Sequence, residues 1–507
     1  MNRISLSNFR IFQKATAFDL APITILTGRN SSGKSSLIKA FILLADFIGS
    51  EESHLRLNLN GERASKHKIN KFENLKNWFE EDNETILSYE DDEYVFTLTF
   101  RLFVEPNFAE LDSLHIELKP LKDILKLENA YGSYELSVSQ NFIDFTTKGD
   151  ADKDILKSQA EYLNEFKIIK EEFKKLSSIL HSKDDFNYGS RGNGSSVDSM
   201  VDVVEQRQKI ETRMALLKSI INPNYFKDKG INFQSNVDIE NFYRPTIPNL
   251  IKDCLLKYVD TNTSYKFSNK EERRYILDFT DKLKKLMSFT SYHLGPNRTF
   301  QSRLYNNDHN GSEINKIIED FIIHEPVHNS EAGLFLRKWL KRFEIGDLLS
   351  VEQIEGTATK VEVRQKGRLV NLADLGFGAG QILTILMHVT AIIERKLSNS
   401  KHSETILVLI EEPEANLHPK LQSLLAEFFA EAALKYNLQF ILETHSEYLI
   451  RKVQVLVKEK KLNSLFKVYY FDEEGPYEMK MREDGKFIDE FGEGFLDESR
   501  KLAFKVL

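Results

Sequence analysis

Residues 28–35 read Gly-Arg-Asn-Ser-Ser-Gly-Lys-Ser, and this stretch decides the fold class. The apolar run Ile23–Leu26 before it predicts a buried strand, and Ser35–Ile48 after it predicts a helix. Two glycines with four residues between them, followed by Lys-Ser, form a loop whose backbone N–H groups can wrap phosphates at a helix N-terminus. The stretch therefore predicts a phosphate-binding loop between a strand and a helix.

The side chains of this loop have separate expected roles. We expect Lys34 to reach the β- and γ-phosphates of ATP and the hydroxyl of Ser35 to ligate Mg²⁺. A chance Gly/Ser turn is the alternative, and the strand–loop–helix context argues against it. The other expected nucleotide contacts are Gly28, Asn30, Ser31, Ser32, Gly33 and Ser36.

A second signal is the apolar run Ile406–Ile410, which ends in Glu411 and Glu412. Such a run predicts a buried strand that delivers two carboxylates to its C-terminal edge, where α/β sheets bind ligands. We expect Glu411 to hold Mg²⁺, directly or through water, and Glu412 to orient or deprotonate the attacking water. Alone, an acid pair at this position is often only a solvated strand end, but the phosphate loop makes the functional interpretation the stronger one.

A third signal follows another predicted strand, Gln439–Leu442, after which the chain reads Glu-Thr-His-Ser. A histidine at such a strand end can hydrogen-bond a γ-phosphate and report its presence. In isolation, His445 would more simply be satisfied by a backbone carbonyl. Because the chain also carries the phosphate loop and the acid pair, we favour the contact with the γ-phosphate.

Length and composition limit the class of protein. The chain has 507 residues, 41% hydrophobic and 29% charged, with 23 glycines and 11 prolines. These values exclude wholesale disorder and linker-rich architectures. The net charge of −8 argues against a uniformly basic nucleic-acid binder, and the single cysteine indicates a reducing compartment. No secretory signal or clear membrane span is recognised, so we expect a cytoplasmic protein without membrane contact.

The middle of the chain changes character. Apolar residues recur at spacings of three and four over residues 156–180 and 200–221, with a polar, Gly/Ser-rich stretch at about 182–199 between them. This pattern predicts an α-helical hairpin, a short antiparallel coiled coil with a flexible tip; two amphipathic helices on a globular core are the alternative. The segment carries a small excess of basic residues. We expect three parts: 1–150 with the phosphate loop and antiparallel strands, 151–290 as the helical insertion, and 291–507.

The order of these motifs resembles the ABC-type ATPases of the SMC/RecF/OLD superfamily, and more closely their stand-alone bacterial AAA-family members. The resemblance covers about 1–150 and 288–500, and it includes the segments 294–298 (Leu-Gly-Pro-Asn-Arg) and 493–495 (Glu-Gly-Phe). It implies an α/β fold: a P-loop ATPase head of the ABC/SMC type, with a mixed sheet, an antiparallel β subdomain and the inserted hairpin. It also implies a homodimer, or an assembly of dimers, that closes around ATP.

By position, the resemblance supplies a signature loop at 374–381 that would press on the partner subunit's nucleotide. Its expected nucleotide contacts are Gly378, Ala379, Gly380 and Gln381, with Asn416 in the D-loop and His445 as the H-switch. Two departures from the family pattern are visible. Residues 378–380 lack the usual signature serine, and 57–72 offers no glutamine for a Q-loop. Both predict slow hydrolysis without loss of ATP binding.

The resemblance leaves three functions open. Stand-alone ATPases of this kind belong to bacterial anti-phage systems, Septu-like or PARIS-like, in which the ATPase controls a separate effector such as a nuclease. Residues 446–507 are too short for the Toprim nuclease domain of OLD proteins, so we expect no Toprim domain here. The alternatives are a RecF-like DNA-binding or DNA-repair clamp, and a nucleotide-gated scaffold with negligible turnover. Basic clusters at 282–285 and 337–342 are candidate DNA contacts, although solvated helix faces explain them more simply.

Overall fold

The computed structural model describes residues 1–49, most of 55–139, a few positions between 161 and 213, 230–235, 247–261, and most of 269–506. The described chain divides into two compact units. Unit 1 comprises Met1–Tyr89, Phe100–Glu110 and Lys285–Leu507, and unit 2 comprises Glu90–Thr99 and Leu111–Lys284. The three-part division at 150 and 290 stays a prediction.

The centre of unit 1 is a six-stranded sheet in the order β11-β16-β17-β3-β18-β19. All neighbouring strands in it are parallel except β18 and β19, which form an antiparallel hairpin. The phosphate-loop strand β3 is buried along its whole length. The strands are β3 (Ile23–Gly28), β11 (Phe289–Leu294), β16 (Thr405–Glu411), β17 (Gln439–Glu443), β18 (Phe466–Asp472) and β19 (Gly475–Glu478).

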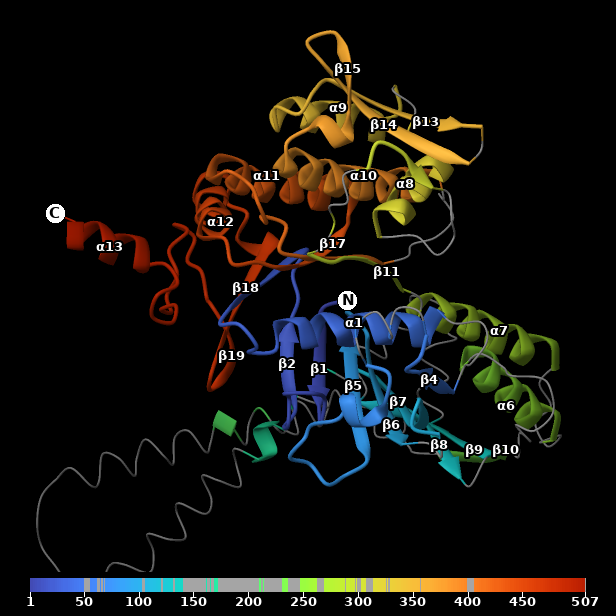
Figure 1. The fold of residues 1–507 in the computed structure, drawn as a ribbon. Helices are drawn as coiled ribbons and strands as arrows, with labels where there is room; N and C mark the ends of the chain where they lie inside the picture. The colour runs from blue at the N-terminus through green and yellow to red at the C-terminus, as the bar shows by residue number, and fades with distance from the viewer. Residues whose placement is uncertain are drawn as a thin grey trace, which may run out of the picture. The chain divides into compact units, whose positions relative to one another are not determined.

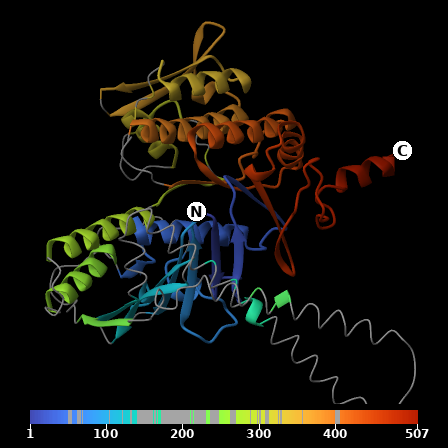
Figure 2. The same cartoon turned by 180° about the vertical axis from the view of Figure 1, so that it is seen from behind.

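Helices cover both faces of this sheet (Figure 1). Helix α1 (Lys34–Gly49) packs on one face against β11 and β17, and α11 (Pro419–Tyr436) packs on the other against β17 and β3. Helices α10 (Phe377–Ser398) and α12 (Glu447–Lys460) lie on the α11 side, as the view from behind also shows (Figure 2). The parallel strands are therefore buried on both sides, which explains their near-continuous apolar sequences.

Unit 1 also contains two smaller groups of elements. The first is β1 (Arg3–Ser7), β2 (Thr16–Asp19), β4 (Arg56–Asn58), η1 (Phe72–Asn74) and β5 (Glu84–Glu90). The second packs over α10 and comprises β12 (Tyr305–Asn306), α8 (Glu313–His324), α9 (Glu331–Arg342), β13 (Leu348–Ile354), β14 (Ala358–Gln365), β15 (Arg368–Asn371) and η2 (Leu372–Asp374). The chain continues through η3 (Asn463–Leu465) before β18 and reaches α13 (Glu498–Val506) after β19.

The described part of unit 2 consists of antiparallel strands and the helices α6 and α7. Strands β7, β8, β9 and β10 pair in that order, and β6 and β7 each contribute residues to both units. Their bounds are β6 (Tyr94–Leu102), β7 (Phe108–Leu118), β8 (Asp123–Ala130), β9 (Ser133–Ser139), β10 (Gly230–Ser235), α6 (Ile247–Thr261) and α7 (Asn269–Leu286). The predicted hairpin over 156–221 falls almost entirely outside the described residues and stays a prediction.

The described elements confirm the predicted fold class. A strand, a glycine loop and a helix occur at β3–α1, and further strands alternate with helices to build a mainly parallel sheet. Helix α10 is long and apolar enough to cross a membrane by length and composition, although the sequence predicted no clear span there. However, 78% of its most apolar window is buried inside the molecule, as in the core helix of a globular domain.

Candidate functional site

Three predicted motifs meet at one edge of the six-stranded sheet. Strand β17 lies between the phosphate-loop strand β3 and the acid-bearing strand β16, and all three run parallel. The register pairs Glu411 with Glu443 and Glu443 with Leu26. The C-terminal ends of the three strands therefore bring residues 28–35, Glu411–Glu412 and Glu443–His445 together, at the edge where open α/β sheets bind ligands.

The phosphate loop has the backbone that its glycines predict. Gly28 has φ 126°, and a side chain there would collide with the carbonyl of Phe471 on β18. The amide of Arg29 donates to that same carbonyl over 3.0 Å, which anchors the loop to the sheet. The ammonium of Lys34, 3% exposed, donates to the carbonyls of Gly28 (3.3 Å) and Arg29 (2.5 Å). Lys34 is thus held where the loop meets the N-terminus of α1.

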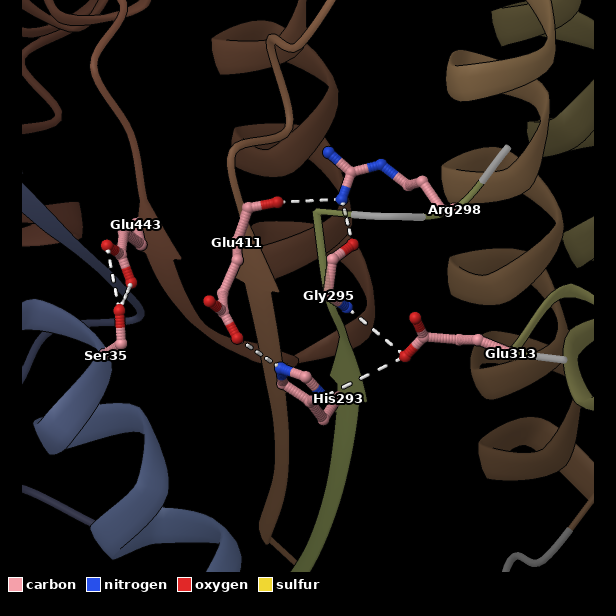
Figure 3. A network of polar contacts seen from close by, with 7 residues as sticks. All are labelled: Ser35, His293, Gly295, Arg298, Glu313, Glu411 and Glu443. Atoms are coloured by element: carbon pink, nitrogen blue, oxygen red, sulfur yellow. Dashed lines mark hydrogen bonds and ion pairs between the residues drawn. The ribbon is translucent and has the colours of Figure 1, made fainter. Parts of the chain in front are cut away.

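The hydroxyl of Ser35 faces a carboxylate that the sequence analysis did not assign. Its Oγ lies 2.9 Å from Oε2 and 3.2 Å from Oε1 of Glu443 (Figure 3). The sequence contains a pattern that could have identified this residue: Glu443 ends a buried strand just as Glu411 does. The strand order explains the pairing: β17, rather than β16, is the direct neighbour of the phosphate-loop strand.

The carboxylate of Glu411 engages a histidine instead. Its Oε1 lies 2.7 Å from Nε2 of His293, which comes from the neighbouring strand β11 (Figure 3). On the other side of the ring, Nδ1 of His293 lies 3.9 Å from Oε1 of Glu313 on α8. Sequence analysis missed His293 and Glu313, because no spacing along the chain relates them to Glu411.

The site concentrates negative charge in a buried place. Burial, together with the nearby charges of Glu411 and Glu412, raises the pKa of Glu443 to about 7. Burial alone would raise the pKa of Glu411, but the hydrogen bond with His293 and the charges of His293, His67 and Lys39 outweigh it and lower that pKa. Burial also lowers the pKa of Lys34, against the opposing effect of Glu443 and Glu412. A cation beside Glu443 would relieve this charge crowding.

A buried arginine fixes the backbone at the acid pair. Nη1 of Arg298 donates to the carbonyls of Glu411 (2.7 Å) and Gly295 (2.6 Å), and Nη2 donates to the carbonyl of Glu412. Arg298 is fully buried, and burial lowers its pKa to about 10 in spite of the surrounding carboxylates. Glu412 itself has φ 45°, and its amide donates to the carbonyl of Glu443 over 2.7 Å. The acid pair is therefore held on a defined turn.

His445 begins the segment after β17, and its backbone is fixed from the acid loop. Its amide donates to Oε1 of Glu414 over 2.6 Å, while its side chain is exposed. Partial burial and the charge of Lys34 lower the pKa of His445, with Glu412 opposing. These effects favour the neutral imidazole, which carries one donor and one acceptor nitrogen.

The predicted signature segment 374–381 starts within η2 and continues into the first turns of α10. A side chain at Gly378 would approach the carbonyl oxygen of Asn416 to 2.8 Å, so glycine permits close contact between the signature and D-loop segments. Asn416 has φ 61° and is exposed. Gln381 is buried within α10, so its expected nucleotide contact stays a prediction.

The residues fit ATP and Mg²⁺ on their own chemistry. The loop ends on a helix N-terminus, whose amide groups and dipole favour a phosphate. The adjoining hydroxyl of Ser35 and carboxylate of Glu443 are hard oxygen donors of the kind Mg²⁺ prefers. The raised pKa of Glu443 shows a buried acid whose ionised form gains from a neighbouring cation.

The basic cluster at 337–342 engages its own neighbours. Lys338 pairs with Glu431 at 2.5 Å and Arg342 with Glu427 at 2.5 Å, both across to α11. Arg342 also lies over the ring of Trp339, 4.5 Å from its centroid. These contacts support the interpretation as a helix face rather than a DNA contact.

Comparison with known proteins agrees with this site. The family model described as an AAA ATPase domain matches residues 1–450. The endonuclease GajA of Bacillus cereus (strain HuB5-5) is 27% identical over 263 residues, which are 49% of this chain and 34% of GajA. The chain thus spans about a third of the length of that relative.

Solved SMC head domains also align over nearly the whole chain. A head with coiled coil and joint derived from Pyrococcus yayanosii has a TM-score of 0.36 at 11% identity, covering 100% of this chain and 99% of that one. The head from Thermotoga maritima has a TM-score of 0.32 at 10% identity, covering 95% and 98%.

Proposed function

The chain is an ATPase of the AAA ATPase domain family, and from that premise we propose that it is an ATP-controlled switch of bacterial anti-phage defence. In this proposal two copies close around Mg-ATP and thereby control a separate effector, a nuclease. The observation that carries the nucleotide part is the convergence of the phosphate loop, the acid pair and His445 at the ends of β3, β16 and β17.

Each residue of the site has a role in this proposal. Lys34 and the loop amides bind the phosphates, and Ser35 holds Mg²⁺, with Glu443 and Glu411 as its supporting carboxylates. Bound Mg²⁺ supplies charge neutralisation for the β- and γ-phosphates. Glu412 orients the attacking water and accepts its proton, and His445 contacts the γ-phosphate. Glu412 suits this task because Arg298 and the amide-to-carbonyl bond with Glu443 fix the backbone that carries it.

Dimerisation would place the signature segment of one copy on the nucleotide of the other. The N-terminus of α10 supports this role, because its first-turn amides form an anion-binding end. The close approach of Gly378 to the exposed Asn416 would let both segments reach one nucleotide. The amides of Ala379 and Gly380 donate to the carbonyl of Gly376, so the attraction would come from the dipole at this helix N-terminus, and closure would depend on the negative charge of ATP.

The link to a nuclease rests on the relative. GajA is an endonuclease, and the similarity covers about half of this chain. We propose that the nuclease is a separate protein whose activity responds to ATP-dependent closure. The same proposal places the protein in the cytoplasm, where ATP, Mg²⁺ and invading DNA are all present.

Two measurements test the proposal. Light scattering on the purified chain should show a monomer-to-dimer shift on addition of Mg-ATP, and Lys34→Ala should abolish both ATP binding and the shift. Lys420→Ala serves as the matched control, because Lys420 is exposed and its ammonium pairs with Glu344. An ATP-bound chain that stays monomeric would contradict the switch.

The second measurement separates this proposal from its alternatives. Affinity purification from cells should recover a neighbouring gene product with the wild-type chain. Salt-sensitive DNA binding without such a partner would favour the RecF-like clamp. Defence that survives Glu412→Gln with ATP binding intact would favour the scaffold without turnover.

A further inference from the structure

Two histidines converge on the carboxylate of Glu411, although a hydrogen-bonded pair needs only one. His293 lies on β11, next to β16, and His67 lies in the segment before η1. One ligand atom from each of His67, His293 and Glu411 lies within 4.8 Å of the other two. The imidazole rings are 4.6 Å apart between centroids and inclined at 76°. We call these three residues the histidine–carboxylate cluster.

We propose that in the nucleotide-free protein the histidine–carboxylate cluster binds a transition-metal ion such as Zn²⁺, Co²⁺ or Mn²⁺, at a site that shares only Glu411 with the proposed Mg²⁺ site. Two imidazoles and one carboxylate are the donor set of zinc and of other first-row metals, whereas Mg²⁺ prefers oxygen donors alone. Ligand atoms bonded to one ion at about 2.0–2.2 Å lie roughly 3–3.5 Å apart. The cluster needs only small side-chain movements to reach that spacing.

The surroundings hold these ligands in place, as they do around established metal sites. Nδ1 of His293 faces Oε1 of Glu313 at 3.9 Å, and the amide of Gly295 donates to the same oxygen at 3.3 Å. A carboxylate that hydrogen-bonds a histidine ligand orients the ring and fixes its tautomer, and Glu313 would have to move closer to His293 to do so. Arg298 meanwhile fixes the backbone of Glu411 through its carbonyl (Figure 3). His293 and Glu411 are shielded, with side chains 10% and 15% exposed.

The ion would be coordinated by Oε1 of Glu411, the oxygen that is hydrogen-bonded to His293 in this structure. Glu411 therefore belongs both to this cluster and to the proposed Mg²⁺ site, whereas Glu443 belongs only to the latter. A transition metal bound here would compete with Mg-ATP for the same carboxylate, or bridge to it. The chain would then sense a metal ion in the absence of nucleotide.

The test uses the full chain, stripped with a chelator and free of nucleotide. Titration with Co²⁺ should give visible d–d absorption that saturates at one ion per chain, and calorimetry with Zn²⁺ should give the same stoichiometry. His293→Gln can keep a hydrogen bond to Glu411 but removes the imidazole, so it should weaken Co²⁺ binding at least tenfold while the chain stays folded. His67→Ala should do the same, and Glu313→Gln should weaken binding by a smaller factor.

Two controls keep this outcome distinct from the nucleotide site. His115→Ala removes a half-buried histidine on β7 and should leave Co²⁺ binding unchanged. Lys34→Ala, which removes the proposed phosphate contact, should also bind Co²⁺ as the wild type does. Absence of stoichiometric binding to the wild type, or wild-type binding by His293→Gln and His67→Ala together, would overturn the metal site and leave the ATPase proposal standing.

Discussion

The hydroxyl of Ser35 lies 2.9 Å from the carboxylate of Glu443, so the expected Mg²⁺ ligand is bonded to the acid of the neighbouring strand. The other acid, Glu411, is bonded to His293. The two carboxylates at this sheet edge are therefore not equivalent, and their variants should behave differently.

Glu443→Gln should weaken the Mg²⁺ dependence of ATP binding more than Glu411→Gln does. An amide can still bond to Ser35 but carries no charge to support a cation, so we expect the enhancement of ATP affinity by Mg²⁺ to fall about tenfold or more. Fluorescent ATP titrations with and without Mg²⁺ measure this enhancement. A larger loss in Glu411→Gln than in Glu443→Gln would reverse the assignment of the two acids.

Glu412→Gln should bind ATP but hydrolyse it at least a hundredfold more slowly, because removal of a general base costs about 10²–10⁴ in rate. The variant should accumulate as an ATP-bound dimer, which gel filtration with light scattering detects. Hydrolysis at the wild-type rate would show that Glu412 is not the base. Glu414→Gln is not a suitable control, since its carboxylate holds the amide of His445.

The buried Glu443 should make the nucleotide-free protein less stable as the pH rises from about 4.5 to about 7. Its pKa is raised to about 7 in the folded chain, so in this window the folded state binds more protons than the unfolded state, and the free energy of unfolding falls with pH. The full effect is on the order of 3 kcal/mol. Chemical denaturation of wild type and Glu443→Gln across this range isolates it: the difference between them should change with pH in the metal-free protein and shrink when Mg-ATP is present.

Arg298→Met should destabilise the chain by about 2–4 kcal/mol, because the carbonyls of Gly295, Glu411 and Glu412 would lose their buried donors. Arg303→Met is the matched control: its side chain is 71% exposed and pairs with Asp374, so a change within about 0.5 kcal/mol is expected. Urea unfolding of the two variants compares them directly. Equal stabilities would show that Arg298 does not fix the acid turn.

Sequence patterns predicted the elements that carry the site. Apolar runs, the glycine spacing and the terminal acids gave β3, α1, β16 and β17 because each signal lies within one short segment. The pairing of Ser35 with Glu443 was not predicted, since it depends on the lateral order of the strands, which no local pattern specifies.

The contacts of His293 and Arg298 were also missed, for a related reason. His293 lies on β11 and Arg298 lies just after it. The position of β11 beside β16 is a tertiary property that no local pattern specifies. The fold class and the motif positions were thus available from the sequence, whereas the partner of each acid was not. The three-part division and the roles of the site residues stay predictions.

The position of β3 in its sheet has a consequence for the order of events during synthesis. Its two neighbours are β17 (Gln439–Glu443) and β18 (Phe466–Asp472), although β3 itself is Ile23–Gly28. The phosphate loop is anchored to Phe471, so it cannot take its final shape on the ribosome until more than four hundred further residues have been translated. Pairing at such long sequence separation is slow, and the nascent strand stays without its neighbours in the meantime. A nascent chain stalled before β17 should therefore fail to retain ATP, although its phosphate loop has already been synthesised.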